Sequence, residues 1–164
     1  MSHPILNNEQ IQHKIRRIAY QIYENNIDEN EIIIAGITNS GFTLAKRIKK
    51  DLDQISEIDS TICEVRVDKK NPLEPIETSL SSEEYINKSI VLVDDVLNSG
   101  TTLIYGVRHF LAVPLKKFQT AVLVDRNHKK YPVKADFKGI SLSTSLNETV
   151  KVIFEEGNDR VELS

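Results

Sequence analysis

Hydrophobic residues follow two alternating patterns along the chain. The first is a short continuous run rich in β-branched residues, which is typical of a strand buried on both faces of a parallel sheet. Such runs lie within residues 32–35, 89–93 and 120–124. A fourth segment, residues 61–67, alternates apolar and polar positions and predicts a strand nearer an edge of the sheet.

The second pattern spaces apolar residues three or four positions apart, which predicts amphipathic helices. The first predicted helix is capped by Asn7 or Asn8 and ends near residues 25–26. A second helix is expected over residues 42–52, and a third follows residue 102. The apolar face of the first helix consists of Ile11, Ile15, Ile18, Ala19 and Ile22. Strands that alternate with helices in this way predict an α/β fold with a mostly parallel sheet.

Residues 68–87 show neither the strand pattern nor the helical spacing of apolar residues, and they contain Pro72 and Pro75. A structureless segment of this length in a compact domain is usually functional or disordered. We therefore predict a mobile lid that carries Lys69 and Lys70 toward the strand ends, with an arm for subunit contact as the alternative. Two short strands are expected later, at residues 139–142 and 150–154.

Composition narrows the class of protein. The chain has 164 residues, of which 40% are hydrophobic and 27% charged, so we expect one globular domain over residues 1–164. The single cysteine, Cys63, excludes a disulfide scaffold and a cysteine-based zinc site. A net charge of −3 argues against a general nucleic-acid binder and leaves room for a local basic face. Without an apolar span of membrane length or a leader pattern, the expected location is the cytoplasm.

Residues 90–103, IVLVDDVLNSGTTL, carry the most specific chemistry. The apolar run delivers two adjacent carboxylates, Asp94 and Asp95, to the tip of a buried strand. Small hydroxyl residues then surround Gly100 at the start of a helix, where backbone N–H groups and the helix dipole favour a phosphate. Because the carboxylates would repel that phosphate, they must face sugar hydroxyls or a metal beside it. A ribose 5-phosphate fits this arrangement, with its phosphate at the loop and its vicinal hydroxyls at the carboxylates.

This segment resembles the phosphoribosyl-pyrophosphate (PRPP) signature of type I phosphoribosyltransferases. The resemblance implies that Asp94 and Asp95 bind the ribose hydroxyls and Mg²⁺, and that Asn98 to Thr102 bind the 5-phosphate. It also makes residues 36–41, GITNSG, the pyrophosphate loop. The substrate contacts implied in these two loops are Thr38, Asn39, Ser40, Gly41, Val96, Leu97, Asn98, Ser99, Gly100, Thr101 and Thr102.

The later part of the chain is similar to one branch of that family, the pyrimidine-operon regulators that are also uracil phosphoribosyltransferases. The matching positions are Asp125, Arg126, His128, Pro132, Asp136, Phe137, Gly139, Thr144 and Ser145. The resemblance implies a parallel central sheet flanked by helices, with a small hood built from terminal segments. It also implies that Val124, Asp125 and Arg126 contact the base and that the protein is a homo-oligomer.

Two departures from the branch affect the chemistry. The pyrophosphate loop lacks the usual arginine and reads Thr38-Asn39-Ser40, so the leaving-group charge must be met by backbone N–H groups, Mg²⁺ or a lysine from elsewhere. After the second strand the branch has a longer arm with a Tyr-Arg-Asp-Asp stretch, where this chain reads Val67-Asp68-Lys69-Lys70. Lys69 is the approximate substitute there, and we group it with Asp94 and Asp95 as catalytic. Asn98 stands where purine-salvage relatives carry an aspartate, which weighs against a purine substrate.

The resulting expectation is a PRPP- and Mg²⁺-dependent transfer of phosphoribose to a nucleobase, most simply a pyrimidine such as uracil. The alternative is a nucleotide-sensing, RNA-binding regulator of pyrimidine genes with little or no catalysis, and a plain nucleotide-binding relative is a third possibility. The RNA face would use the basic residues between 126 and 138, although such a run is also typical of a solvated edge. We expect His128 to be a surface residue rather than an acid or base.

Overall fold

The computed structural model describes residues 2–164 and contains a six-stranded sheet with strand order β4-β3-β2-β5-β6-β7. The order departs from the sequence order because β2 pairs with β3 on one side and with β5 on the other. The bounds are Glu31–Ile37 for β2, Asp59–Arg66 for β3, Glu77–Thr78 for β4, Ser89–Leu97 for β5, Lys117–Arg126 for β6 and Phe137–Leu142 for β7. Only β4 runs antiparallel to its neighbour. The predicted mostly parallel sheet is therefore confirmed.

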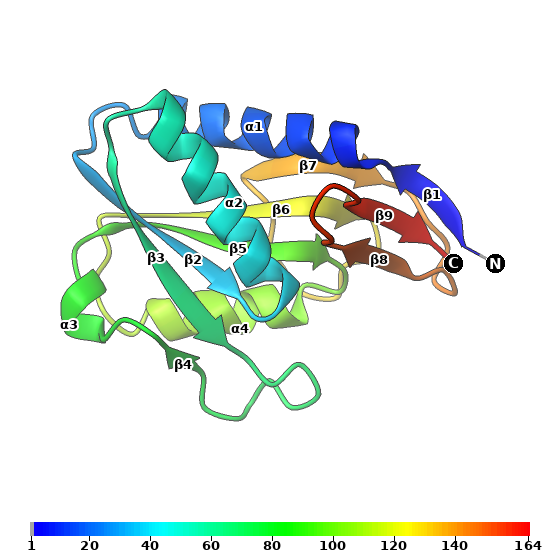
Figure 1. Ribbon diagram of the computed structural model, residues 1–164. Helices are drawn as coiled ribbons and strands as arrows, with labels where there is room; N and C mark the ends of the chain where they lie inside the picture. Colours follow the sequence, from blue (N-terminus) through cyan, green and yellow to red (C-terminus); the bar gives the residue numbers. More distant parts are fainter. Residues whose placement is uncertain (1) are drawn as a thin grey trace.

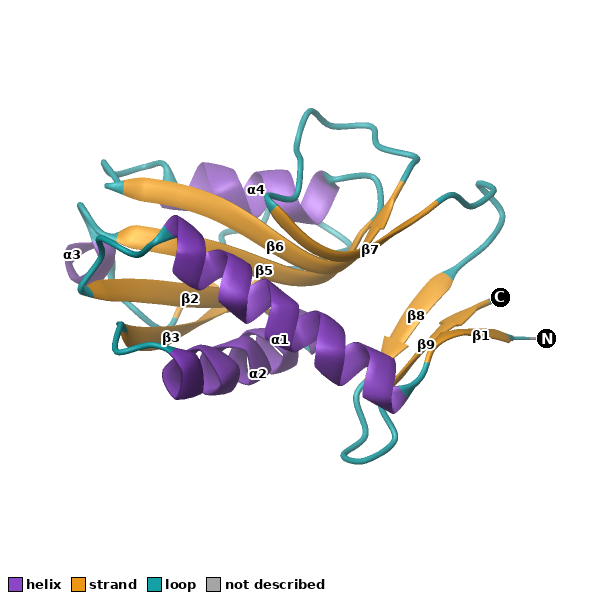
Figure 2. Cartoon of the chain, turned by 90° about the horizontal axis from the view of Figure 1, so that it is seen from above, coloured by secondary structure: helices purple, strands orange, loops and turns teal. Residues whose placement is uncertain are grey.

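Helices cover both faces of this sheet (Figure 1). The helices α1 (Asn8–Asn25) and α2 (Ser40–Ile55) lie together on one face, and α4 (Thr101–Phe110) lies on the other, as Figure 2 shows from above. One hydrophobic cluster fills the space beneath α1 and α2, and a second lies beneath α4 and includes Phe110. The sheet is thus buried on both faces, which is why its central strands are continuous apolar runs.

The first helix begins as its sequence predicts. Asn7 is the cap: its Oδ1 accepts a hydrogen bond from the Gln10 backbone N–H, and Gln10 Oε1 accepts one from the Asn7 N–H, each at 2.9 Å. This reciprocal pair satisfies two N–H groups that the helix leaves free. The apolar face expected from the spacing is buried.

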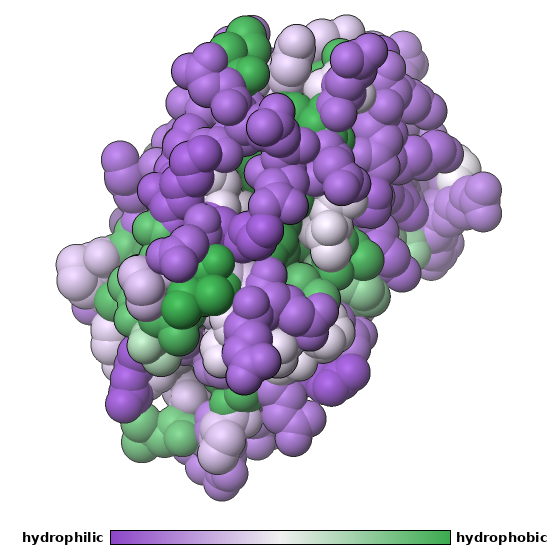
Figure 3. Space-filling model, turned by 90° about the vertical axis from the view of Figure 1, so that its left-hand side faces the viewer, coloured by the Kyte–Doolittle hydropathy of each residue, from purple (hydrophilic) through white to green (hydrophobic). Residues whose placement is uncertain are grey.

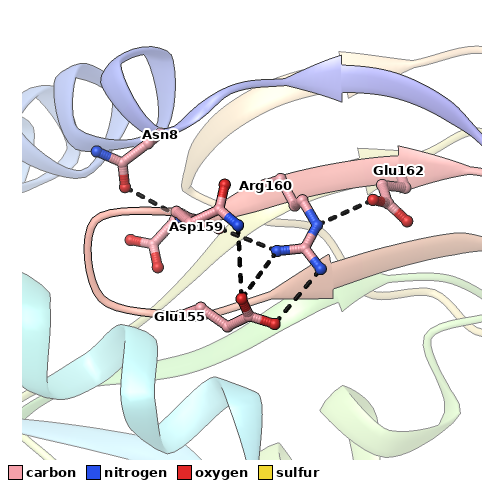
Figure 4. A network of polar contacts seen from close by, with 6 residues as sticks. Asn8, Glu155, Asp159, Arg160 and Glu162 are labelled. Atoms are coloured by element: carbon pink, nitrogen blue, oxygen red, sulfur yellow. Dashed lines mark hydrogen bonds and ion pairs between the residues drawn. The ribbon is translucent and has the colours of Figure 1, made fainter.

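The two chain ends form the small hood that the resemblance implied. Strands β1 (His3–Leu6), β9 (Arg160–Leu163) and β8 (Val150–Ile153) make a separate antiparallel sheet in that order, beside the carboxyl ends of the parallel strands (Figure 1). The turn between β8 and β9 is tied to the helices. Asp159, only 1% exposed, pairs with Arg47 of α2 and accepts a hydrogen bond from Gln12 at 2.7 Å. Its backbone N–H donates to Asn8 Oδ1 (Figure 4).

The predicted lid is wrong in its extent. Residues 77–78 form β4, which pairs with β3, and the short helix α3 (Ser82–Tyr85) inserts Tyr85 into the core. The Tyr85 ring packs edge-on against Phe110, with 5.0 Å between centroids. Regular anchored structure therefore begins at residue 77, and only residues 68–76, which we call the flap, form an irregular projecting loop.

The end of the molecule at which the parallel strands begin is mostly hydrophilic, with small separate hydrophobic patches (Figure 3). No helix within residues 2–164 is long and apolar enough to cross a membrane.

Candidate functional site

A cavity of about 170 Å³ lies where β5 ends and α4 begins. It gathers residues from the flap, from β5, from the loop that follows β5 and from the first residue of the hood strand β8. The lining residues are Lys69, Asp94, Asp95, Val96, Leu97, Asn98, Ser99, Gly100, Thr101, Thr102, Leu103, Val122 and Val150. A larger hollow of about 520 Å³ opens around Tyr23 and Glu57 near the other end of the sheet, outside the predicted chemistry.

Residues 98–102, here called the phosphate loop, turn the chain from β5 into α4. Gly100 has a φ of 91°, a left-handed conformation that glycine adopts without steric cost. A Cβ at this position would lie 2.7 Å from Val133 Cγ1. The hydroxyls of Ser99 and Thr101 are 2.8 Å apart at the start of the helix. Hydroxyls and backbone N–H groups therefore converge at the positive end of the α4 dipole, an arrangement that binds anions.

The loop is held from behind by a second segment. The Ser99 carbonyl accepts hydrogen bonds from the backbone N–H groups of Lys130 and Tyr131, at 2.8 and 3.1 Å. These bonds leave the hydroxyl face of the loop turned toward the cavity.

The Asp94 carboxylate is buried next to Asp95 and Lys69. Asp94 is 3% exposed, and its Oδ1 accepts a hydrogen bond from the Asp95 N–H at 2.9 Å. Burial raises the pKa of the Asp94 carboxyl well above its usual range, the adjacent Asp95 charge raises it further, and Lys69 opposes both. Lys69 Nζ lies 3.6 Å from Asp94 Oδ1. The flap thus holds Lys69 beside Asp94, and the catalytic role of Lys69 stays a prediction.

The predicted pyrophosphate-loop residues Thr38 to Gly41 do not line this cavity, and of the four Gly41 is the one that lies against Asp94. Thr38 donates its N–H to the Val65 carbonyl at 2.9 Å, which ties the end of β2 to β3. The peptide between Thr38 and Asn39 is cis. The helix α2 begins at Ser40, slightly earlier than the sequence predicted. A Cβ on Gly41 would lie 2.9 Å from Asp94 Oδ1, so only glycine allows α2 to start this close to the carboxylate.

The third predicted group is not part of the cavity lining. Val124 is fully buried in the core, so its side chain is not presented to a ligand. Asp125 is 9% exposed and pairs with Lys129 at 2.9 Å and Lys138 at 3.4 Å. The Arg126 guanidinium is hydrogen-bonded to protein groups. These three side chains therefore make internal contacts in this structure, and their contact with a base stays a prediction.

His128 also departs from expectation. It is half-buried, and its Nε2 contacts the Thr144 carbonyl, which gives it a structural partner instead of a free surface position. Three cavity-lining residues, Leu103, Val122 and Val150, were not singled out by the sequence. Only the fold brings Val150 next to the phosphate loop.

The site fits Mg²⁺ shared with a ligand. Within residues 2–164 there is no cluster of three or more histidine, cysteine, aspartate or glutamate side chains that could hold a metal. Mg²⁺ commonly binds through one or two carboxylates while water and substrate phosphates complete its shell. Asp94 and Asp95 beside an anion-binding loop meet that requirement, and Lys69 would release Asp94 as the cation entered.

A parallel sheet with a hood, a carboxylate pair and a phosphate loop at the strand ends defines the phosphoribosyltransferase class. Residues 2–155 match the family described as phosphoribosyl transferase domain, and the chain belongs to that family. Among its relatives is the bifunctional protein PyrR of Leuconostoc mesenteroides, 33% identical over 97% of this chain and 96% of the relative. The bifunctional protein PyrR of Streptococcus sanguinis is 36% identical over 90% of this chain and 88% of the relative.

Solved structures confirm the fold. A hypoxanthine phosphoribosyltransferase of Trypanosoma cruzi, in complex with the product IMP, matches 91% of this chain and 83% of its own with a TM-score of 0.77 at 16% identity. A hypoxanthine-guanine phosphoribosyltransferase of Bacillus anthracis matches 90% of this chain and 84% of its own with a TM-score of 0.73 at 22% identity. The chain therefore has the type I phosphoribosyltransferase fold.

Proposed function

We propose that this protein transfers phosphoribose from PRPP to a pyrimidine base such as uracil and releases pyrophosphate. The observation that carries the proposal is the shared cavity: Asp94 and Asp95 face the same space as the phosphate loop. A phosphate held by that loop places its sugar toward the carboxylates, which accept hydrogen bonds from vicinal hydroxyls. The carboxylates then bind the sugar of a ligand, and the phosphate loop binds the phosphate of the same ligand.

The ring nitrogen of the base forms a bond to C1 of the ribose while the bond from C1 to the pyrophosphate oxygen breaks. The electron pair of that bond leaves with pyrophosphate, and the proton of the ring nitrogen is released to water. Positive charge builds on the sugar ring, as in glycoside cleavage. The nearby Asp94 and Asp95 carboxylates favour this charge, and Lys69 favours the negative charge that develops on pyrophosphate. Mg²⁺, when bound, would neutralise further charge on pyrophosphate.

The choice of a pyrimidine rests on Asn98. This side chain follows β5 at the edge of the cavity, and its Oδ1 accepts a hydrogen bond from Arg126 at 3.0 Å. An amide in this position has no carboxylate with which to receive a proton from a purine ring. The proposal includes the cytoplasm as the location, as expected from the sequence pattern, and a homo-oligomer as the assembly, as the family resemblance implies.

The test is calorimetry of PRPP binding in the presence of Mg²⁺. We expect the double variant Asp94→Asn, Asp95→Asn to remain folded, because amides fill the same space, and to lose measurable PRPP binding. The matched control is Asp136→Asn, which alters a carboxylate that accepts hydrogen bonds from Thr120 away from the cavity. Wild-type affinity in the folded double variant would refute the assignment.

A second candidate function, RNA binding, is suggested by the resemblance to pyrimidine-operon regulators and by relatives called bifunctional. It would use the basic loop, residues 126–138. Three lysines of this loop are paired with carboxylates: Lys129 and Lys138 with Asp125, and Lys134 with Asp136. RNA would have to compete with these ion pairs.

Gel shifts with pyrimidine-operon leader RNA and a scrambled control separate the two functions. A nucleotide-dependent preference for the leader, with an affinity that falls steeply with salt, would support the regulator. Equal binding of both RNAs would remove it.

A further inference from the structure

The guanidinium of Arg126 connects two loops at the carboxyl end of the sheet. Its Nη1 donates to Asn98 Oδ1 at 3.0 Å, in the phosphate loop. Its Nε and Nη2 donate to Thr144 Oγ1, at 3.0 and 2.8 Å. Its Nη2 also donates to the carbonyls of Ser145 and Glu148, at 3.3 and 2.7 Å. One side chain thus bonds to the loop after β5 and to the loop after β7.

The residues that follow Arg126 hold the same threonine. The Thr144 N–H donates to Asn127 Oδ1 at 3.1 Å, and the Thr144 carbonyl contacts His128 Nε2. Each polar group of Thr144 therefore has a partner in residues 126–128, and the residue is only 8% exposed. These contacts anchor the loop after β7 to residues 126–128, which are distant from it in the sequence.

Strand register explains why Arg126 can span the two loops. In the central sheet Leu97 lies opposite Asp125, and Arg126 lies opposite Leu142. The ends of β5, β6 and β7 are therefore level, with Arg126 on the middle strand. The loop after β7 leads into β8, whose first residue, Val150, lines the same cavity as the phosphate loop.

We propose that Arg126 is a positioning residue that sets the separation between the phosphate loop and the hood. Its bond to Asn98 fixes one wall of the cavity, and its bonds to Thr144 and Glu148 fix the segment that carries the other wall. The inference rests on the proposed function, since it assumes a ligand whose phosphate binds the loop and whose base reaches toward the hood. The planar guanidinium has the forked geometry for this span, which a lysine ammonium lacks.

The inference predicts a selective effect on ligand binding. Uridine 5′-monophosphate would span both walls, whereas ribose 5-phosphate would depend on the phosphate loop and carboxylates alone. We expect Arg126→Gln to weaken the nucleotide by about tenfold, which is the effect of losing one or two hydrogen bonds to a charged group. Ribose 5-phosphate should lose less than about threefold, and Arg126→Lys should restore only part of the nucleotide affinity.

The measurement is calorimetry of both ligands, combined with hydrogen–deuterium exchange of the ligand-free variants. The matched control is Arg160→Gln, because within residues 2–164 Arg160 bonds only inside one hairpin, to Glu155, Glu162 and the Asn158 carbonyl (Figure 4). We expect this control to keep wild-type affinity for both ligands. In Arg126→Gln, exchange should rise together in residues 98–103 and 143–150.

Two results would overturn the inference. Equal weakening of both ligands by Arg126→Gln would indicate general damage to the site, and unchanged exchange in either segment would show that Arg126 does not link them. If the wild-type protein binds neither ligand, the proposed function fails, while the exchange comparison still decides whether Arg126 joins the two walls.

Discussion

Asp94 is an acidic side chain that is almost fully buried at the cavity. Burial and the adjacent Asp95 raise the pKa of its carboxyl, so the folded protein keeps this proton to a higher pH than the unfolded chain does. Above the ordinary aspartate range the unfolded chain releases its proton first, and stability falls as pH rises toward the folded pKa. The carboxylate is therefore retained at a cost in stability, which suits a group kept for a ligand.

This electrostatic cost predicts that Asp94→Asn raises the stability of the ligand-free protein at pH 7. An increase in melting temperature of about 2–4 °C is expected, which corresponds to about 1 kcal/mol in a chain of this size. The difference from wild type should shrink as the pH is lowered through the ordinary aspartate range, because the unfolded chain then takes up its proton as well. Scanning calorimetry at several pH values measures it, and a variant less stable than wild type at pH 7 would contradict this account of Asp94.

Gly100 combines a left-handed backbone with a crowded surrounding, and Gly157 separates the two effects. Both have positive φ, 91° and 80°, yet a Cβ on Gly157 would meet nothing within 4 Å. We expect Gly157→Ala to lose about 1 kcal/mol from backbone strain alone. Gly100→Ala should lose more, because of the contact with Val133, and should also lose ribose 5-phosphate binding. Equal effects on stability and normal ligand binding would exclude a phosphate site in this loop.

At the scale of elements, the flap differs from the segment that follows it. Residues 68–76 project from the end of β3, whereas residues 77–87 contain β4 and the buried Tyr85. Amide exchange in the ligand-free protein should be fast in the first segment and slow in the second. Mg²⁺ and PRPP should protect the flap alone, because a lid closes when ligand binds. Protection that changes only with protein concentration would make the flap a subunit contact.

Two adjacent lysines of the flap provide a matched pair. Lys69 lies 3.6 Å from Asp94 Oδ1, while Lys70 is exposed and has no ion pair within residues 2–164. Lys69→Ala should lower kcat by about ten- to a hundredfold through lost charge stabilisation of pyrophosphate. Lys70→Ala should change kcat by less than about threefold. Steady-state kinetics with PRPP compare them, and equal losses would deny Lys69 a specific role.

The elements differ in how far the sequence predicts them. The central strands are predicted by their continuous apolar runs. The helix α1 is predicted by its N-cap and by apolar residues spaced three or four positions apart. The structure agrees with both predictions. The strand β4 was not predicted because a segment of two residues is too short to show an alternating pattern. The burial of Tyr85 was not predicted because it depends on contact with Phe110 of α4. In the site, the motif predicted the phosphate loop and carboxylates. The internal role of Arg126 depends on strand register, which no local pattern contains.

For the molecule as a whole, residues of the hood and of the sheet line one cavity. The hood is built from both chain ends and is tied to α1 and α2 through Asp159 (Figure 4). The site is thus complete only when residues from the flap, the sheet and the last strands come together. Such an arrangement places a transferred group between two surfaces that exclude water, which a reactive ribosyl centre requires.

The most direct test of the proposed activity is pyrophosphate release from PRPP and Mg²⁺ with a panel of bases. Uracil should give turnover that disappears when Mg²⁺ is chelated and in the Asp94→Asn, Asp95→Asn variant, while hypoxanthine and guanine should give none above the blank. Release with a purine and not with uracil would contradict the base assignment. Tight PRPP binding without release for any base would contradict the central claim that this cavity transfers phosphoribose.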